Sequence, residues 1–314
     1  MGAIQVATYK CNSGGALLSG SVQFIEGVPT ADAAQLEKNK SLNVVSGISN
    51  RLIYLHIDTG REKNSPFVTD NTGRPLEANP LRDLRDLRVR KAILMALSRE
   101  AIVARVMEGK AVPASQLLPD GFFGTSNKLK VEKYDAEAAR KLMAEAGYPN
   151  GFALTIHDPN NRYINDDKIA QTVAQLLRRI NIDAKVETMP SSVFFTRATK
   201  LEFSLMLLGW GAESGEASSP LKALLHTYNR ELGLGNTNRG RYSNPLVDQL
   251  TAQAIVTIDD NKREKLLQEA TAIAIGDLGI IPIHYEVSTW GMLKSPSYKA
   301  RTDQYTLAMD IRLR

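Results

Sequence analysis

A regular alternation of strand and helix patterns between residues 152 and 208 constrains the fold of this chain more than any other feature. Apolar runs predict strands at Phe152–His157, Asp183–Thr188 and Phe203–Leu208. Between them, Asp167–Ile180 and Ser192–Lys200 are predicted as helices, the first with a clear 3.6-residue apolar period. This order, at these lengths, is typical of crossover units that cover a sheet with helices. We therefore predict an α/β fold.

Further elements are predicted on both sides of this region. Helices are predicted after the capping residues Asp86, Ser98, Asp135, Asn244 and Asp259 or Asp260, with a shorter one after Thr30 or Asp32. Strands are predicted at Val22–Ile25, Val44–Val45, Leu52–Ile57 and Ile280–Tyr285, with a last one at Tyr305–Arg312. Residues 58–85 and 209–244 are predicted to be irregular.

Composition excludes several classes of protein. Hydrophobic residues make up 43% of the 314 and charged residues 23%, which is ordinary for a globular protein and unlike a disordered chain. A single cysteine, Cys11, excludes an internal disulfide scaffold. The net charge of +5 is small for this length and gives little support to a nucleic-acid partner. No apolar run predicts a membrane span, and the first residues lack the pattern of a signal peptide.

Motifs for the common catalytic and cofactor chemistries are missing from the sequence. Gly233, Gly235 and Gly240 have the wrong spacing for a dinucleotide fingerprint, and no Gly-Lys-Ser/Thr segment indicates a P-loop. The four histidines are scattered and none lies at metal-ligand spacing, so we predict neither a metal nor a cofactor. Gly-x-Ser-x-Gly is absent. Glu213 and Glu216 could do acid and base work, which keeps an unrecognised α/β hydrolase as an alternative, but we expect no enzyme.

One cluster of residues does suggest a ligand site. The predicted strand Phe203–Leu208 runs into Gly209-Trp210-Gly211, and open α/β sheets bind ligands beyond the carboxyl ends of their strands. An indole there, between glycines that allow close backbone approach, suits a stacking wall. A surface loop with one buried tryptophan would explain the same residues, and both interpretations stay open. The candidate ligand-binding residues are Trp210, Gly211, Glu213, Glu216, Ser218, Asn238, Arg239, Arg241 and Tyr242.

Several segments, in their order along the chain, resemble motifs of the dipeptide, oligopeptide and nickel class (family 5) of ABC-transporter extracellular solute-binding proteins. The segments are Ala16-Leu17-Leu18-Ser19-Gly20, Tyr54-Leu55-His56-Ile57, Leu87–Ile102, Leu117–Gly124, Tyr134–Tyr148, Gly209-Trp210, Arg241-Tyr242-Ser243-Asn244-Pro245 and Ile281-Pro282-Ile283-His284. Each segment is a weak signal alone, but their shared order is specific.

This resemblance implies a periplasmic-binding-protein-like fold of class II (cluster C), in which two α/β lobes close over a ligand. Residues 53–288 align with a nearly whole second lobe, the ligand-binding lobe. Residues 1–52 align with a remnant of the first lobe, in which 1–13 match nothing, and residues 289–314 return to it. We therefore expect an N-terminally truncated member of the family with a partial first lobe.

The function implied by the resemblance is that of the periplasmic substrate-binding component of an ABC importer, which holds a peptide or peptide-like solute between its lobes and docks on the permease. Trp210 is expected to stack on the ligand and Glu213 and Glu216 to pair with a cation. The side chains expected to donate hydrogen bonds are Asn238, Arg239 and Arg241, while Tyr242 could equally be packed in the core.

The sequence also departs from the family pattern. Peptide binders of the family often carry an aspartate after the Gly-Trp pair, which holds the α-amino group of the ligand, and this chain has Glu213 and Glu216 there instead. No nickel-chelating histidine pattern is visible. The alternative is therefore a degenerate or repurposed fragment that binds nothing by closure, and whose exposed sheet edges favour a homodimer.

Overall fold

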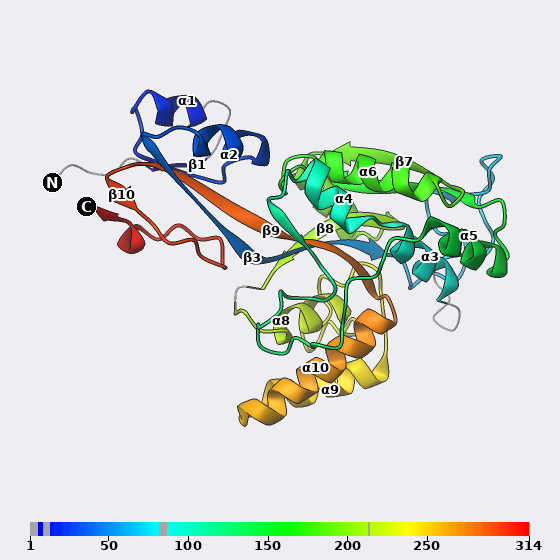
Figure 1. The fold of residues 1–314 in the computed structure, drawn as a ribbon. Coiled ribbons are helices and arrows are strands. Elements are labelled where there is room, and N and C mark those ends of the chain that lie inside the picture. The colour runs from blue at the N-terminus through cyan, green and yellow to red at the C-terminus, as the bar shows by residue number, and fades with distance from the viewer. Residues whose placement is uncertain (1–5, 9–12, 82–86, 213, 314) are drawn as a thin grey trace.

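The computed structural model describes residues 6–8, 13–81, 87–212 and 214–313 (Figure 1). Within them, nine strands form one mixed sheet in the order β1-β2-β9-β3-β8-β6-β4, with β5 added on β9 and β7 on β6. The strands of this sheet are β1 (Val6–Thr8), β2 (Phe24–Glu26), β3 (Leu42–Ile57), β4 (Val68–Thr69), β5 (Ala111–Pro113), β6 (Phe152–Pro159), β7 (Ile182–Met189), β8 (Leu205–Gly211) and β9 (Ile280–Leu293). A separate antiparallel pair joins β10 (Pro296–Ser297) to β11 (Arg312–Leu313).

Helices cover both faces of the sheet in its larger part (Figure 1). The helical segments are α1 (Ser13–Leu18), α2 (Thr30–Glu37), α3 (Arg88–Ala96), α4 (Arg99–Ala101), η1 (Ile102–Val106), α5 (Ala136–Glu145), α6 (Asp166–Arg178), α7 (Ser191–Thr199), α8 (Ser218–Pro220), η2 (Leu221–Leu225), α9 (Pro245–Val256), α10 (Asp260–Gly276) and η3 (Ala308–Asp310). Of these, η1 and η2 are π-helical and η3 is a 3₁₀ turn. None of the helices in the described part of the chain combines the length and the apolarity needed to cross a bilayer.

The predicted alternation between residues 152 and 208 is confirmed as β6-α6-β7-α7-β8. Strand β6 pairs in parallel with both β7 and β8, as crossover connections require. The apolar face of α6, including Ile169 and Val173, is fully buried against the sheet. The α/β fold class predicted from the sequence is therefore the one observed.

Side chains alternate between two cores because successive residues of a strand point to opposite faces. Ile53 and Leu55 of β3 lie in the core beneath α3, α5 and α6, whereas Leu52 and Tyr54 lie in the core beneath α9 and α10. In β9 the alternation changes at a register shift, where Ile53 pairs with His284 but Tyr54 pairs with Pro282.

Two long strands join the larger part of the molecule to a smaller body. Figure 1 shows β3 and β9 running side by side from the body built by α1, α2, β1, β2 and the C-terminal segment into the helix-covered part. The expected lobe boundaries after residues 52 and 288 fall inside these strands and not in loops. Their pairing shifts register between Ile48 and Leu52. A bulge of this kind locally bends and twists a strand.

Three predicted helix caps are confirmed. The Asp135 carboxylate accepts from the Ala138 N–H at 2.8 Å, and the Asp259 carboxylate accepts from the Lys262 N–H at 2.8 Å. Asn244 accepts from the Leu246 N–H at 2.9 Å, with Pro245 in the first turn. These caps explain why α5, α9 and α10 begin where the sequence indicated.

Other predictions need correction. The strand expected at Tyr305–Arg312 is reduced to β11 (Arg312–Leu313). Residues 308–310 form a 3₁₀ turn, and the Asp310 carboxylate there pairs with Arg301 at 3.0 Å. Strand β8 continues to Gly211, so Trp210 lies in a strand and not in a loop. Helix α2 begins at Thr30 with Pro29 as its cap, and neither Thr30 nor Asp32 caps it. The expected cap Asp86 lies outside the described residues.

Candidate functional site

A cleft of about 600 Å³ lies where β3 and β8 meet the C-terminal segment. We call it the β3–β8 cleft. It combines residues that are far apart in the chain, because Arg51 and Gln304, which are hydrogen-bonded to each other, both line it. Its lining residues are Asn50, Arg51, Tyr54, Arg162, Tyr163, Phe195, Leu208, Gly209, Trp210, Gly211, Ser219, Thr237, Arg239, Asp303, Gln304 and Tyr305.

Strand pairing places the aromatic wall of the cleft. Trp210 of β8 pairs with Leu52 of β3, and Tyr54 pairs with Leu208 two positions further. The Trp210 indole N–H donates to the Ser219 hydroxyl at 3.3 Å, which fixes the half-buried ring. Gly209 makes room for a third ring, because a Cβ at this position would lie 2.7 Å from the Tyr163 ring. The Tyr163 hydroxyl donates to the Gly209 carbonyl at 3.2 Å.

Arg239 is a half-buried arginine of the cleft that forms no ion pair with a described residue. Its guanidinium lies 5.3 Å from the Phe195 ring centroid, and its buried Nε has no hydrogen-bond partner among the described residues. Burial lowers the pKa of Arg239 below its usual value, although Tyr54 and Tyr163 oppose this effect. A half-buried guanidinium without a carboxylate partner is costly, and an anionic ligand group would offset that cost.

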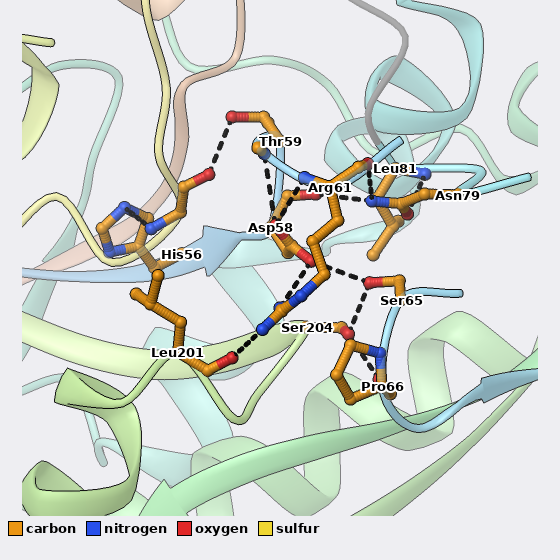
Figure 2. A network of polar contacts seen from close by, with 12 residues as sticks. His56, Asp58, Thr59, Arg61, Ser65, Pro66, Asn79, Leu81, Leu201 and Ser204 are labelled. Atoms are coloured by element: carbon orange, nitrogen blue, oxygen red, sulfur yellow. Dashed lines mark hydrogen bonds and ion pairs between the residues drawn. The ribbon is translucent and has the colours of Figure 1, made fainter. Parts of the chain in front are cut away.

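The loop that carries Arg239 is tied to the end of β3 (Figure 2). The Gly240 N–H donates to the His56 Nε2 at 3.1 Å, and the Thr59 N–H donates to the Gly240 carbonyl at 2.8 Å. His56 is fully buried, and burial lowers its pKa to about 3, so it acts as a neutral acceptor. Gly240 allows this approach, since a Cβ there would lie 2.1 Å from the Ile57 carbonyl oxygen.

Asp58, directly after β3, organises the neighbouring loop (Figure 2). Its carboxylate accepts from the Ser65 hydroxyl at 2.9 Å and pairs with Arg61 at 3.0 Å. The Asn79 amide donates to the Asp58 carbonyl at 3.0 Å, so the two ends of the segment 58–79 are joined at Asp58. This network lies beside the loop that carries Arg239 and supports it.

A second network closes the other side of the cleft. The Arg51 guanidinium donates from Nε to the Gln304 Oε1 at 2.6 Å and lies 3.4 Å from the Glu286 carboxylate. The Gln304 amide donates to the same carboxylate at 3.1 Å, and the Ile164 N–H donates to it at 3.3 Å. Burial raises the pKa of Glu286, while Arg51, Gln304 and the Ile164 N–H lower it. Glu286 thus joins β9, the C-terminal segment and the β6–α6 loop.

Comparison with known proteins gives the family. The profile of the family described as "Bacterial extracellular solute-binding proteins, family 5 Middle" matches residues 10–231. The chain belongs to this family. The resemblance found in the sequence motifs is therefore confirmed.

Relatives and solved structures agree with this assignment. The chain is 31% identical over 278 residues to the glutathione-binding protein GsiB of Escherichia coli O157:H7, which covers 86% of this chain and 49% of the relative. It thus spans about half the length of the curated relatives it matches. The fold is similar to that of HbpA2 from Haemophilus parasuis (TM-score 0.77, 24% identity, 96% of this chain and 55% of that chain). It is also similar to that of the periplasmic binding protein DppA from Helicobacter pylori in complex with the peptide STSA (TM-score 0.78, 22% identity, 95% and 54%).

Within this family 5 chain, the structure brings part of the predicted site together. Trp210, Gly211 and Arg239 line the β3–β8 cleft. Ser218 does not line it, but the next residue, Ser219, does. Glu213 lies outside the described residues.

The other predicted residues are engaged elsewhere. Glu216 pairs with Arg263 of α10 at 3.5 Å, and the Arg241 guanidinium lies 4.1 Å from the Tyr228 ring centroid. The buried Asn238 amide donates to the His226 and Tyr242 carbonyls at 2.9 and 2.7 Å and so holds the turn. Tyr242 is a core residue whose hydroxyl donates to Asp277 at 2.6 Å. None of these four lines the cleft.

Sequence reasoning missed most of the cleft because its residues are far apart in the chain. Tyr54 lies in a segment that predicts a strand and resembles a family motif, but nothing in that segment indicates a ligand site. Arg162 and Tyr163 follow β6 in the same way that Trp210 ends β8. The rule that ligands bind beyond the carboxyl ends of strands could have found the latter two. Gln304 carried no such signal.

Two further histidines, His157 and His284, are packed inside the protein. His157 stacks on Phe203 with the ring centroids 4.0 Å apart, and burial lowers its pKa to about 4. His284 is fully buried, and burial lowers its pKa to about 3. In the described part of the chain, no three His, Cys, Asp or Glu side chains come together as a metal site would require.

Proposed function

We propose that this chain is the ligand-binding part of a periplasmic solute-binding protein that serves an ABC importer, and that it binds an acidic, peptide-like solute in the β3–β8 cleft. The observation that carries the proposal is the Arg239 guanidinium, half-buried without a carboxylate partner among the described residues, beside an aromatic wall. The role is binding and delivery to a permease, not catalysis.

The charges and rings of the cleft support this class of ligand. Arg51, Arg162 and Arg239 line it, and Arg51 is paired with Glu286. The acidic lining residue, Asp303, is already paired with Arg301, so Arg162 and Arg239 supply the surplus charge. The described part of the cleft therefore has a cationic surplus that suits carboxylates. The half-buried Trp210 ring offers a flat face for a peptide plane or side chain of the solute.

The ligands of relatives suggest a first probe. GsiB of Escherichia coli is named as a glutathione-binding protein, and DppA of Helicobacter pylori is described in complex with a peptide. Glutathione carries two carboxylates and one ammonium group, so it matches a cleft with surplus arginines. We propose glutathione, or an acidic tripeptide of similar size, as the solute.

Calorimetric titration of glutathione into the wild-type chain and two variants tests the proposal. Arg239→Gln should weaken binding by about 10- to 100-fold, because a charge-assisted hydrogen bond contributes roughly 1.5–3 kcal/mol. Trp210→Ala should also weaken binding, through loss of the stacking wall. Arg241→Gln is the matched control: it lies in the same loop but outside the cleft and should bind like wild type.

Two results would contradict the proposal. If Arg239→Gln and Trp210→Ala leave the affinity unchanged, the site is wrongly assigned. If the wild-type chain binds neither glutathione nor the tripeptide, and native mass spectrometry shows the purified chain empty and dimeric, the alternative of a fragment without closure-type binding is favoured.

A further inference from the structure

A second pocket, remote from the cleft, lies between α3 and the end of α10. Its volume is about 340 Å³. Most of its wall is apolar, and its charged residues are three cations and one anion. The lining residues are Leu87, Lys91, Leu94, Arg99, Ala114, Ser115, Leu129, Lys130, Glu132, Ile275, Gly276, Leu278 and Pro282. None of them belongs to the β3–β8 cleft.

Arg99 is the buried charge of this pocket. The residue is 1% exposed, and its side chain reaches backbone oxygens only. Nε donates to the Pro282 carbonyl at 2.9 Å, and Nη1 donates to the Leu94 and Leu97 carbonyls at 3.3 Å each. Nη2, which carries two further N–H groups, has no partner among the described residues.

The surrounding charges leave Arg99 unneutralised. Glu100 and, to a smaller extent, Glu132 raise the pKa of Arg99, but neither forms an ion pair with it, and Glu132 is paired with Lys91. Burial has the larger effect and lowers the pKa of Arg99 to about 10, so the side chain is still charged at neutral pH. With Lys130 also on the wall, the pocket has a surplus of two positive charges. A buried charge left in this way calls for an anionic partner.

We propose that this pocket is a second ligand site, which binds a small organic acid by its carboxylate beside Arg99 and by an apolar chain or ring against the leucine walls. Leu94, Leu129 and Ile275 supply that apolar surface. The proposal does not depend on the function assigned to the cleft, since no residue is shared between the two sites.

Hexanoate is a suitable probe. Hexan-1-ol keeps its apolar chain without the carboxylate, and acetate keeps the carboxylate without the chain. In a titration followed by methyl NMR of the full chain, hexanoate should shift the signals of Leu94 and Ile275. Its affinity should exceed that of hexan-1-ol by about tenfold or more, as expected for a charge-assisted hydrogen bond. Acetate at the same concentrations should leave the methyl signals unmoved.

Three variants locate the binding without removing Arg99. Leu129→Trp should fill the pocket from its half-buried rim and abolish the hexanoate shifts. Leu232→Trp, at a residue that is 69% exposed and outside the pocket, is the matched control and should leave them intact. Arg239→Gln should also leave them intact, which separates this site from the cleft.

Three outcomes would overturn the proposal. Hexan-1-ol could bind as tightly as hexanoate, which would remove the role of the charge. Hexanoate could still bind in Leu129→Trp, which would place it elsewhere. Its binding could be lost in Arg239→Gln, which would show that it occupies the β3–β8 cleft.

Discussion

At the scale of single residues, Asp158 is a buried carboxyl group in surroundings that disfavour its charged form. It lies near the end of β6, is fully buried, and neither carboxyl oxygen has a hydrogen-bond partner among the described residues. Burial raises its pKa to about 9, and the nearby carboxylates of Asp166 and Asp167 add to the effect. Folding therefore requires Asp158 to take up a proton at neutral pH.

This predicts a stability cost that grows with pH. The unfolded carboxyl ionises near pH 4 and the folded one near pH 9, so the unfolded state binds fewer protons between these values and stability falls as pH rises. Asp158→Asn removes this titration. The variant should be more stable than wild type by about 1 kcal/mol or more at pH 8, and the gain should shrink towards pH 4.

Urea denaturation of both proteins at several pH values measures this difference. Glu137→Gln is a suitable control, because Glu137 is exposed, lies in the first turn of α5 and does not act on Asp158. There the neutral side chain should cost a few tenths of a kcal/mol, through loss of a favourable charge at a helix N-terminus. A gain for Asp158→Asn that did not vary with pH would contradict the assignment.

At the scale of elements, tertiary contacts fix the glycine-rich loop of residues 233–241. Its glycines predicted an irregular segment, and it has no regular secondary structure. It is held nonetheless, because the Asn238 side chain closes the turn and Gly240 docks on the end of β3. Arg239 lies between these two anchored residues in the chain.

Gly240→Ala should therefore damage both stability and binding. The new Cβ would meet backbone, which cannot move aside as a flexible side chain would, so we expect a loss of about 1–3 kcal/mol in the free energy of unfolding. Because the loop must shift, Arg239 should move and glutathione affinity should fall as well.

Gly276→Ala provides the comparison. Gly276 ends α10, and a Cβ there would meet nothing within 4 Å. This substitution should be neutral or stabilise the chain by up to about 1 kcal/mol. Thermal unfolding measures the stability of both variants, and calorimetric titration measures their affinity for glutathione. If the two variants have the same stability and affinity, Gly240 is not needed for close approach.

At the scale of the whole molecule, the junction between the two bodies lies beside the cleft. Strands β3 and β9 cross it with a register shift, and the Glu286 carboxylate joins both strands to the C-terminal segment. Arg51 and Gln304 belong to this junction and also line the cleft. A ligand in the cleft would therefore contact residues of the junction.

Glu286→Gln tests whether this carboxylate holds the junction. The variant keeps the size of the side chain but leaves the Arg51 guanidinium without its ion pair, so we expect a loss of about 1–3 kcal/mol in stability. Hydrogen exchange of residues 303–305 should become faster, because Gln304 loses its charged acceptor.

Glu37→Gln is the matched control for this experiment. Glu37 also links the two bodies, through an ion pair with Lys110, but its side chain is 42% exposed. Exposed pairs contribute about 1 kcal/mol or less, and exchange at residues 303–305 should be unchanged. If the two variants behave alike, Glu286 has no special role at the junction.

The sequence by itself determined the local elements and the family. The apolar periods gave the β6-α6-β7-α7-β8 alternation, and the caps at Asp135, Asn244 and Asp259 placed three helix starts, because both signals depend on neighbours in the chain. The same local character allowed Trp210 to be singled out.

Only the tertiary structure decided which of the candidate residues share a cleft. Arg239 and Arg241 are two positions apart, yet one lines the cleft and the other stacks on Tyr228 outside it. The partners Arg51 and Gln304 are 253 positions apart and meet because β3 and β9 run antiparallel across the junction. Such contacts follow from sheet pairing and packing over long chain separations, which no local pattern encodes.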